Sequence, residues 1–334
     1  MEIRVETERG ARPGPADAQV GESVRLVVTQ RRGRALPEGS RVRWLRVAPH
    51  LQHAEGAPED DPTYSNAVFG GADHGKWVGM DTIEYRTEPM GLGRHARIEG
   101  NALVLEGAPP PTWEERTPSR STPMAGTLWL AAEVELPDGR RLRTADQDDT
   151  DRLGLESKVT RVSFRAGEGF VGWLSAYFGV PYVFGSTPAQ SDRRVGIDCA
   201  DVLVGARRSQ TGRRLGYTSV RGMGRLADAV SDVLLLDRDG TIRDAEGEPV
   251  SLRWGEAIQS GDMLAIDYAN DGSDVVLPRA WDHIGVLLED HATEGAPGIL
   301  DGKDVLRHMS LRGLTDQPLT AHGRIRLRIW RWKR

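Results

Sequence analysis

The sequence predicts an α+β C-terminal domain, with helices packed on an antiparallel sheet, preceded by an all-β, sandwich-like domain. A chain of 334 residues is longer than one typical core of roughly 150 residues. Its first part carries short strand patterns separated by turns, and its second part carries helical patterns followed by strands. We therefore expect a β-rich accessory domain at 1–160 and a second domain at 161–334.

Strand patterns in the first part have turn-rich stretches between them. The expected strands are Ser23–Thr29, Arg41–Val47, Thr82–Thr87, Ala96–Leu105, Leu128–Leu136 and Arg140–Thr144. The sequence Pro137-Asp138-Gly139, which is typical of a tight turn, joins the last two. This spacing favours an antiparallel sandwich, with Val159–Phe164 as a connecting strand.

The second part begins with helical periodicity. A helix is expected over Glu168–Phe178, ending at Gly179, and another begins near Cys199. Strands are then expected at Met263–Tyr268, Asp282–Leu288, Val305–Ser310 and Arg324–Trp332. The order of helices first and sheet second gives the α+β prediction.

Composition excludes several classes of function. The net charge of -5 gives no electrostatic reason to expect nucleic acid as a partner. No apolar run approaches the roughly 18 to 20 residues of a transmembrane segment. Residues Met1–Arg4 lack the pattern of a signal peptide, so two locations stay open: secreted or periplasmic if the chain is a mature form, cytoplasmic if Met1 is native.

Cys199 is the strongest candidate for chemistry. It is the one cysteine, so the chain forms no internal disulfide and no cysteine-rich zinc site. Asp198 and Asp201 form a capping-box-like pattern that places the thiol in the first turn of a helix. The helix start favours a thiolate there, whereas the two aspartates oppose it. A nearby histidine is therefore required.

His283 is the candidate partner, because it begins a strand and Gly285 leaves room beside it. His308 lies in a neighbouring strand pattern, where it can hold the other ring nitrogen of His283. Together these residues predict a thiolate–imidazole pair that hydrolyses an amide bond. No metal or other cofactor is needed for this chemistry.

An ordered set of motifs resembles the NlpC family of papain-like cell-wall peptidases. The motifs are Val180-Pro181-Tyr182-Val183-Phe184-Gly185, Gly196-Ile197-Asp198-Cys199-Ala200, Gly261-Asp262-Met263-Leu264 and Asp282-His283-Ile284-Gly285-Val286, and the resemblance covers roughly Gly167 to Arg334. It implies a papain-like fold and an endopeptidase that cleaves peptidoglycan stem peptides, commonly between D-glutamate and a diamino acid.

The resemblance also implies roles for single residues. Cys199 resembles the nucleophile of the family, His283 its base and His308 its third polar residue. Tyr182 resembles a side chain that lines the site near the oxyanion, and Asp198 resembles a residue that, in some members, meets the substrate amine.

This sequence departs from the family pattern at several positions. Ala200-Asp201 stands where Ser-Gly is usual, so Asp201 adds a charge where substrate would lie. Phe184 stands where Trp is common. The wide gap between Cys199 and His283 implies an insertion across about 211–250.

Other interpretations remain open. The same residues suit an acyltransferase or an amidase on a non-wall substrate, or an inactive module that binds a peptide or glycan. Cys199 and His283 are also compatible with purely structural roles in a core. The sequence specifies neither the oligomeric state nor the ligand of the first domain.

Three further patterns are weaker. Val233–Thr241 resembles the first motif of haloacid-dehalogenase-type phosphatases, with Asp237 and Asp239 as the acids, but the turn residues after it favour a hairpin. Gly70–Lys76 has phosphate-loop spacing without the Ser or Thr that holds magnesium, so we interpret it as a loop. His50 and His53 lack companion acids for a metal.

Overall fold

The chain folds into two compact units. The computed structural model describes residues 1–7, 10–52, 63–64, 83–109, 124–268, 281–291 and 297–334. The main body of the first unit ends at Ile197, and the second unit takes over at Asp198. The segment from residue 161 to Ile197 thus packs with the β-rich part of the chain.

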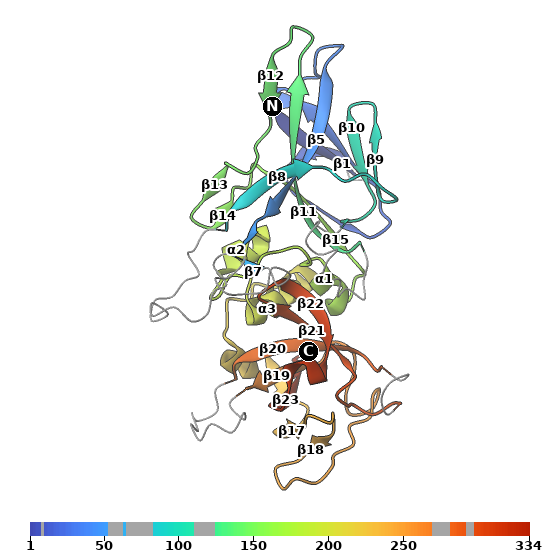
Figure 1. Cartoon of the computed structure of the whole chain (residues 1–334), viewed down its shortest axis with the longest axis vertical. Helices are drawn as coiled ribbons and strands as arrows, with labels where there is room; N and C mark the ends of the chain where they lie inside the picture. The colour runs from blue at the N-terminus through green and yellow to red at the C-terminus, as the bar shows by residue number, and fades with distance from the viewer. Residues whose placement is uncertain (8–9, 53–62, 65–82, 110–123, 269–280, 292–296) are drawn as a thin grey trace. The chain divides into compact units, whose positions relative to one another are not determined.

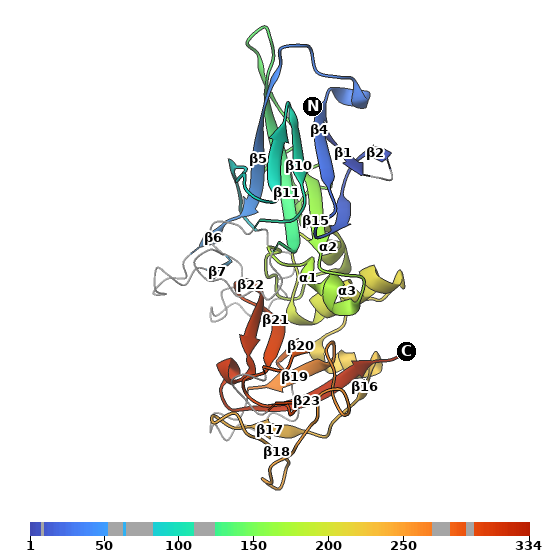
Figure 2. The same ribbon diagram turned by 90° about the vertical axis from the view of Figure 1, so that its right-hand side faces the viewer.

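Two sheets build the first unit (Figures 1 and 2). One has the strand order β2 (Gly10–Pro13), β1 (Glu2–Thr7), β4 (Val24–Thr29), β10 (Ala102–Leu105), β9 (Ala96–Glu99), and every neighbouring pair is antiparallel. The other has the order β3 (Ala16–Gln19), β15 (Thr160–Arg165), β11 (Gly126–Glu135), β5 (Arg41–Pro49), β8 (Tyr85–Pro89), with β12 (Arg141–Arg143) also on β11. In this sheet β3 pairs with β15 in parallel.

Short elements complete the unit. Strand β6 (Leu51–Gln52) pairs with β7 (Thr63–Tyr64), and β13 (Thr150–Asp151) pairs with β14 (Gly154–Leu155). A 3-10 turn, η1, spans Arg31–Gly33.

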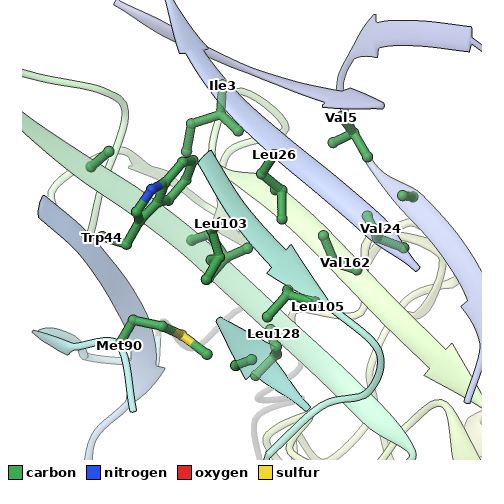
Figure 3. Packing of buried hydrophobic residues seen from close by; sticks show 14 of the residues in the cluster. Ile3, Val5, Val24, Leu26, Trp44, Met90, Leu103, Leu105, Leu128 and Val162 are labelled. Atoms are coloured by element: carbon green, nitrogen blue, oxygen red, sulfur yellow. The ribbon is translucent and has the colours of Figure 1, made fainter. Parts of the chain in front are cut away.

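One hydrophobic core joins the two large sheets. Burial alternates along β4, as expected for a strand with one face on a core. Figure 3 shows Leu26 and Leu103 from one sheet close to Trp44, Leu128 and Val162 from the other. Burying each such side chain contributes about 1.5–3 kcal/mol, so this cluster is the main source of stability in the unit.

The helices of the first unit are short. Helix α1 spans Phe170–Ser175 and α2 spans Pro188–Arg193. The chain leaves the region of α1 through Gly179, whose φ of 79° suits a glycine. Thr187 and Gln190 form a capping box that starts α2.

The second unit is built on one large sheet. Its strand order is β18 (Ile242–Arg243), β17 (Leu234–Leu236), β23 (Ile325–Trp332), β19 (Met263–Asp267), β20 (His283–Glu289), β21 (Val305–Ser310), β22 (Gly313–Pro318), with β16 (Ala227–Ala229) also on β23. The pairing of β17 with β18 confirms the predicted hairpin. The unit also has two 3-10 turns: η3 (Val220–Arg225) precedes β16, and η4 (Leu319–His322) lies between β22 and β23.

Helix α3, Cys199–Thr211, packs on this sheet against β20 and β21. It begins at the predicted position and ends at Gly212, which has a φ of 67°. A separate hydrophobic core stabilises the sheet; its members include Leu264, Ile266, Leu287, Leu306, Leu327 and Ile329.

The predicted α+β, papain-like fold is wrong. Strands make up 42% of the structure and helices 14%, and several antiparallel sheets form it. The helical periodicity over Glu168–Phe178 yields only the 6 residues of α1. Short motifs therefore carried local information about turns and strand starts, but they did not specify the architecture.

Within the described residues, no helix is long and apolar enough to cross a membrane.

Candidate active site

The first turn of α3 is held by Asp198. Its backbone is extended, and its carboxylate Oδ1 accepts hydrogen bonds from the amides of Ala200 at 3.0 Å and Asp201 at 2.7 Å. The predicted N-cap is therefore confirmed. Cys199 follows as the first helical residue and is half-buried.

Two neighbouring strands bring two histidines together. His283 begins β20, and Gly285, two residues on, pairs directly with His308 on β21. A Cβ atom at Gly285 would lie 2.8 Å from the Arg307 carbonyl oxygen and 2.9 Å from the His308 Cβ. The glycine thus makes room for β21, and His283 Nε2 and His308 Nδ1 lie 2.9 Å apart.

The thiol lies against the start of the same strand. A hydrogen bond from the backbone amide of Ile284, the residue after His283, favours the ionised form of Cys199 and so lowers its pKa. The second unit therefore brings Cys199, His283 and His308 into one neighbourhood. These are the three residues that the sequence predicts as catalytic.

Gln317 on β22 extends the chain of hydrogen bonds. Its amide oxygen Oε1 lies 3.0 Å from His308 Nε2. An amide oxygen only accepts, so His308 carries its proton on Nε2 and accepts at Nδ1. His283 must then donate from Nε2, which leaves the Nδ1 lone pair of His283 available as a base. Sequence reasoning missed Gln317.

A buried ion pair fixes this arrangement. Arg307 donates to Asp316 from Nε at 2.7 Å and from Nη2 at 2.8 Å, and both side chains are almost completely buried. These two residues immediately precede His308 and Gln317. Because breaking a buried pair typically costs about 3–5 kcal/mol, the pair resists any shift that would separate the histidine from the glutamine.

A second polar pair borders the histidines. The hydroxyl of Tyr268, which follows β19, lies 2.9 Å from Nδ1 of His322 in η4. The His322 ring is centred 4.7 Å from the His308 ring and 6.0 Å from the His283 ring. Tyr268 is 41% exposed, so it presents its ring to solvent beside the dyad. No sequence motif indicated either residue.

Burial keeps the three imidazoles neutral. It lowers the pKa of His308 to about 4 and that of His322 to about 3. Burial, followed by the charges of His308 and His322, also lowers the pKa of His283 well below its usual value. At neutral pH these rings therefore act as hydrogen-bonding groups and as a base, without charge.

Burial also raises the pKa of the Cys199 thiol, and the charge of Asp198 raises it further. The resting pair is therefore a neutral thiol beside a neutral imidazole, where the sequence predicts a thiolate. Both side chains remain half-buried and so are still accessible to a reactant.

The two aspartates at the helix start differ in environment. Burial and the charge of Asp201 raise the pKa of Asp198 to about 7. The Tyr217 hydroxyl donates to Asp198 Oδ2 at 3.0 Å, a contact that sequence reasoning missed. Asp201 is completely buried and forms an ion pair with Arg208 at 3.6 Å. Its charge thus faces the protein interior.

Tyr182 and the phosphatase-like motif complete the set of predicted residues. Tyr182 belongs to the first unit, where it is 6% exposed and its backbone pairs with Ile197. Asp237, from the phosphatase-like motif, forms ion pairs with Arg243 and Arg324 at 2.8 Å and 3.3 Å. The segment Gly70–Lys76 and His53 lie outside the described residues.

Comparison with known proteins gives no assignment. No family model, no curated protein and no solved structure matches this chain. Within the part of the chain that the structure describes, no group of three or more His, Cys, Asp or Glu side chains is arranged to hold a metal ion.

Proposed function

We propose that this protein is a cysteine hydrolase with Cys199 as nucleophile and His283 as general base and acid. One observation carries the proposal: the hydrogen-bonded series from Gln317 through His308 leaves Nδ1 of His283 unprotonated, and the thiol is bound by the next amide along the same strand. A cysteine with a nearby base that is oriented by a third group is the usual arrangement for covalent catalysis.

The neutral resting pair favours attack with simultaneous proton transfer. The Cys199 sulfur forms a bond to the carbonyl carbon, its proton moves to His283 Nδ1, and the carbonyl electron pair moves to oxygen. The tetrahedral intermediate collapses, the carbon–nitrogen bond breaks, and the same proton passes to the leaving amine.

Water completes the cycle. It attacks the thioester carbonyl and gives one proton to His283, and the released acid leaves Cys199 to recover that proton. During both steps His308 accepts a hydrogen bond from the transient imidazolium, and the N-terminal end of α3 stabilises negative charge on sulfur.

The substrate we propose is an amide bond in a peptidoglycan stem peptide. The ordered motifs around Cys199 and His283, which resemble the NlpC family, support this choice. The buried ion pair of Asp201 with Arg208 also supports it, because the extra carboxylate is directed away from solvent. Neither this reaction nor this substrate requires a papain-like fold.

A direct test uses labelled muropeptides with the intact chain and two variants, Cys199→Ala and His283→Ala. We expect both variants to lose hydrolysis, while a His291→Ala control keeps it, because His291 lies outside the cluster of imidazoles. Hydrolysis that persists at the wild-type rate in Cys199→Ala would eliminate the proposal.

Two alternatives use the same residues. An acyltransferase or an amidase with a non-wall substrate would transfer the acyl group to an added amine in preference to water, or would ignore muropeptides. An inactive peptide- or glycan-binding module would leave Cys199 unlabelled by an electrophilic thiol probe at neutral pH.

A further inference from the structure

Helix α3 and the residues after it carry an excess of positive charge. Residues 202–227 contain six arginines and no aspartate or glutamate, although the whole chain has 49 acidic residues against 44 lysines and arginines. One of the six, Arg208, pairs with Asp201 and donates to the Leu215 carbonyl, so its role is structural. We call the other five the arginine surface: Arg207, Arg213, Arg214, Arg221 and Arg225.

The end of β23 joins the two ends of this segment. Arg207 lies over the Trp332 ring, with its guanidinium carbon 5.6 Å from the ring centroid. The next residue, Lys333, donates from its amide to the Leu226 carbonyl at 3.1 Å and from Nζ to the Arg225 carbonyl at 3.0 Å. Figure 2 shows β16, which follows η3, beside the end of β23. The arginine surface is therefore continuous from the end of α3 to the end of η3, and Lys333 adds one more positive charge.

The protein does not neutralise these charges. The four members from Arg213 onward are exposed, and across the described ranges no carboxylate forms an ion pair with any member of the arginine surface. Lys333 has Asp228 at 3.9 Å, but both side chains are exposed and such a pair contributes little. Burial lowers the pKa of Arg207, and the positive charge of Arg213 lowers it further. The guanidinium groups thus repel one another, and an anion between them would relieve this repulsion.

The residue type indicates phosphate as the preferred anion. A planar guanidinium group forms two parallel hydrogen bonds with a phosphate, whereas lysine acts as a point charge. The cations are exposed and lie on several elements, so they form an open surface and do not enclose a pocket. A single phosphate would contact only one or two of them. A chain with phosphates at regular intervals would contact several at once and would bind more tightly for that reason.

Little free apolar surface accompanies the charge. Within residues 202–227, all of which the structure describes, Tyr217 is the one large exposed hydrophobic side chain, and its hydroxyl donates to Asp198. The Trp332 ring is already covered by Arg207. Single-stranded nucleic acid binds through bases stacked on free aromatic rings, and a membrane surface binds through apolar side chains that enter the lipid. A phosphate polymer without bases or acyl chains therefore fits this surface better.

We propose that the arginine surface binds a linear phosphodiester polymer with a polyol backbone. The guanidinium groups hold successive phosphates, and the counterions that these phosphates release favour the complex. Cys199 and Arg213 stand at opposite ends of α3, so a polymer bound at Arg213 leaves the thiol accessible. The proposal is independent of the proposed function, because binding uses neither Cys199 nor His283.

The test is a fluorescence anisotropy titration of the intact chain with a labelled glycerol-phosphate oligomer of about ten units. We expect saturable binding that weakens about 100-fold between about 50 and 200 mM salt. Contact with about five phosphates of a flexible chain gives this dependence, because log affinity then falls against log salt concentration with a slope of about −3.5. Inorganic phosphate at the same concentration of phosphate groups should not displace the oligomer.

Two pairs of substitutions locate the site. Arg213→Gln/Arg214→Gln and Arg221→Gln/Arg225→Gln should each weaken binding at least tenfold at about 100 mM salt, and each should reduce the slope by about 1.4. Arg213→Lys/Arg214→Lys should restore the slope, because it restores the charge. All four positions are exposed, and thermal unfolding verifies that each variant is folded.

The matched control is Arg140→Gln/Arg141→Gln. It removes the same charge from an adjacent exposed pair of arginines in the first unit, so it separates the arginine surface from the net charge of the protein. We expect this control to bind the oligomer as tightly as the wild type.

Several results would overturn the proposal. These are no binding of the oligomer, affinity independent of salt, or an equal loss of affinity in the control and in the two glutamine pairs. Tighter binding to vesicles of phosphatidylglycerol and phosphatidylcholine than to the oligomer would assign the surface to a membrane. At least tenfold tighter binding of single-stranded DNA with the same number of phosphates would assign it to nucleic acid. Absence of muropeptide hydrolysis would reject only the enzyme, since none of these titrations depends on it.

Discussion

Gln317→Leu tests whether Gln317 on β22, acting through His308, sets which ring nitrogen of His283 carries the proton. The substitution removes the acceptor 3.0 Å from His308 Nε2 and keeps a side chain of similar size. One such hydrogen bond contributes about 0.5–1.5 kcal/mol. Its loss should therefore lower the preference of both rings for the neutral form with the proton on Nε2 by about 2- to 12-fold. We expect the rate of hydrolysis to fall by a similar factor, with little change in KM.

The direct assay is ¹⁵N NMR of the histidine side chains. In the wild type, we expect His283 to carry its proton on Nε2 and His308 to carry its proton on Nε2. In Gln317→Leu, both rings should become mixtures of the two neutral forms, whereas a Gln210→Leu control on α3 should leave them unchanged. Finding the His283 proton on Nδ1 in the wild type would refute the reasoning.

Three further predictions follow from the same geometry. Asp198→Asn keeps an N-cap and removes a charge that raises the pKa of Cys199, so iodoacetamide should alkylate the thiol faster at pH 8 than in the wild type; an unchanged rate would contradict this. The pKa of His308 is about 4 in the folded protein and about 6.5 in the unfolded chain. Between these values the unfolded chain binds more protons than the folded protein. The free energy of unfolding should therefore fall by up to about 3 kcal/mol as the pH drops from 6.5 to 4. In denaturant titrations, the free energy of unfolding of His308→Gln should not show this decrease between pH 6.5 and 4. Gly285→Ala introduces a Cβ atom 2.8 Å from the Arg307 carbonyl oxygen and should destabilise the protein by about 1–3 kcal/mol. This loss should be visible as a lower Tm. An unaltered Tm would exclude the close approach of β21 to Gly285.

The strands of the second unit were predictable because their patterns are local. Met263–Ile266 is a continuous apolar run, and Val305–Ser310 contains Val305, Leu306 and Met309; both segments are found as strands. The start of α3 was also predictable, because Asp198 caps it with its own side chain. In the first part, the pattern over Ala96–Leu105 is two strands, since Gly100 turns the chain with a φ of 60°.

The fold class was not predictable in the same way. The motifs around Cys199 and His283 describe turns, a cap and a strand start, and these local features are compatible with a protein that is mostly sheet. Gln317 and His322 were missed because their roles arise from the pairing of strands and turns distant in sequence. No spacing rule connects Gln317 to His308 before the register of β22 is known.

The measurement closest to the central claim is intact-protein mass spectrometry of the enzyme quenched during turnover of a muropeptide. We expect a covalent acyl adduct on Cys199 in the wild type, no adduct in Cys199→Ala, and much slower adduct formation in His283→Ala. Product release without any adduct on Cys199, at a rate that Cys199→Ala retains, would contradict it.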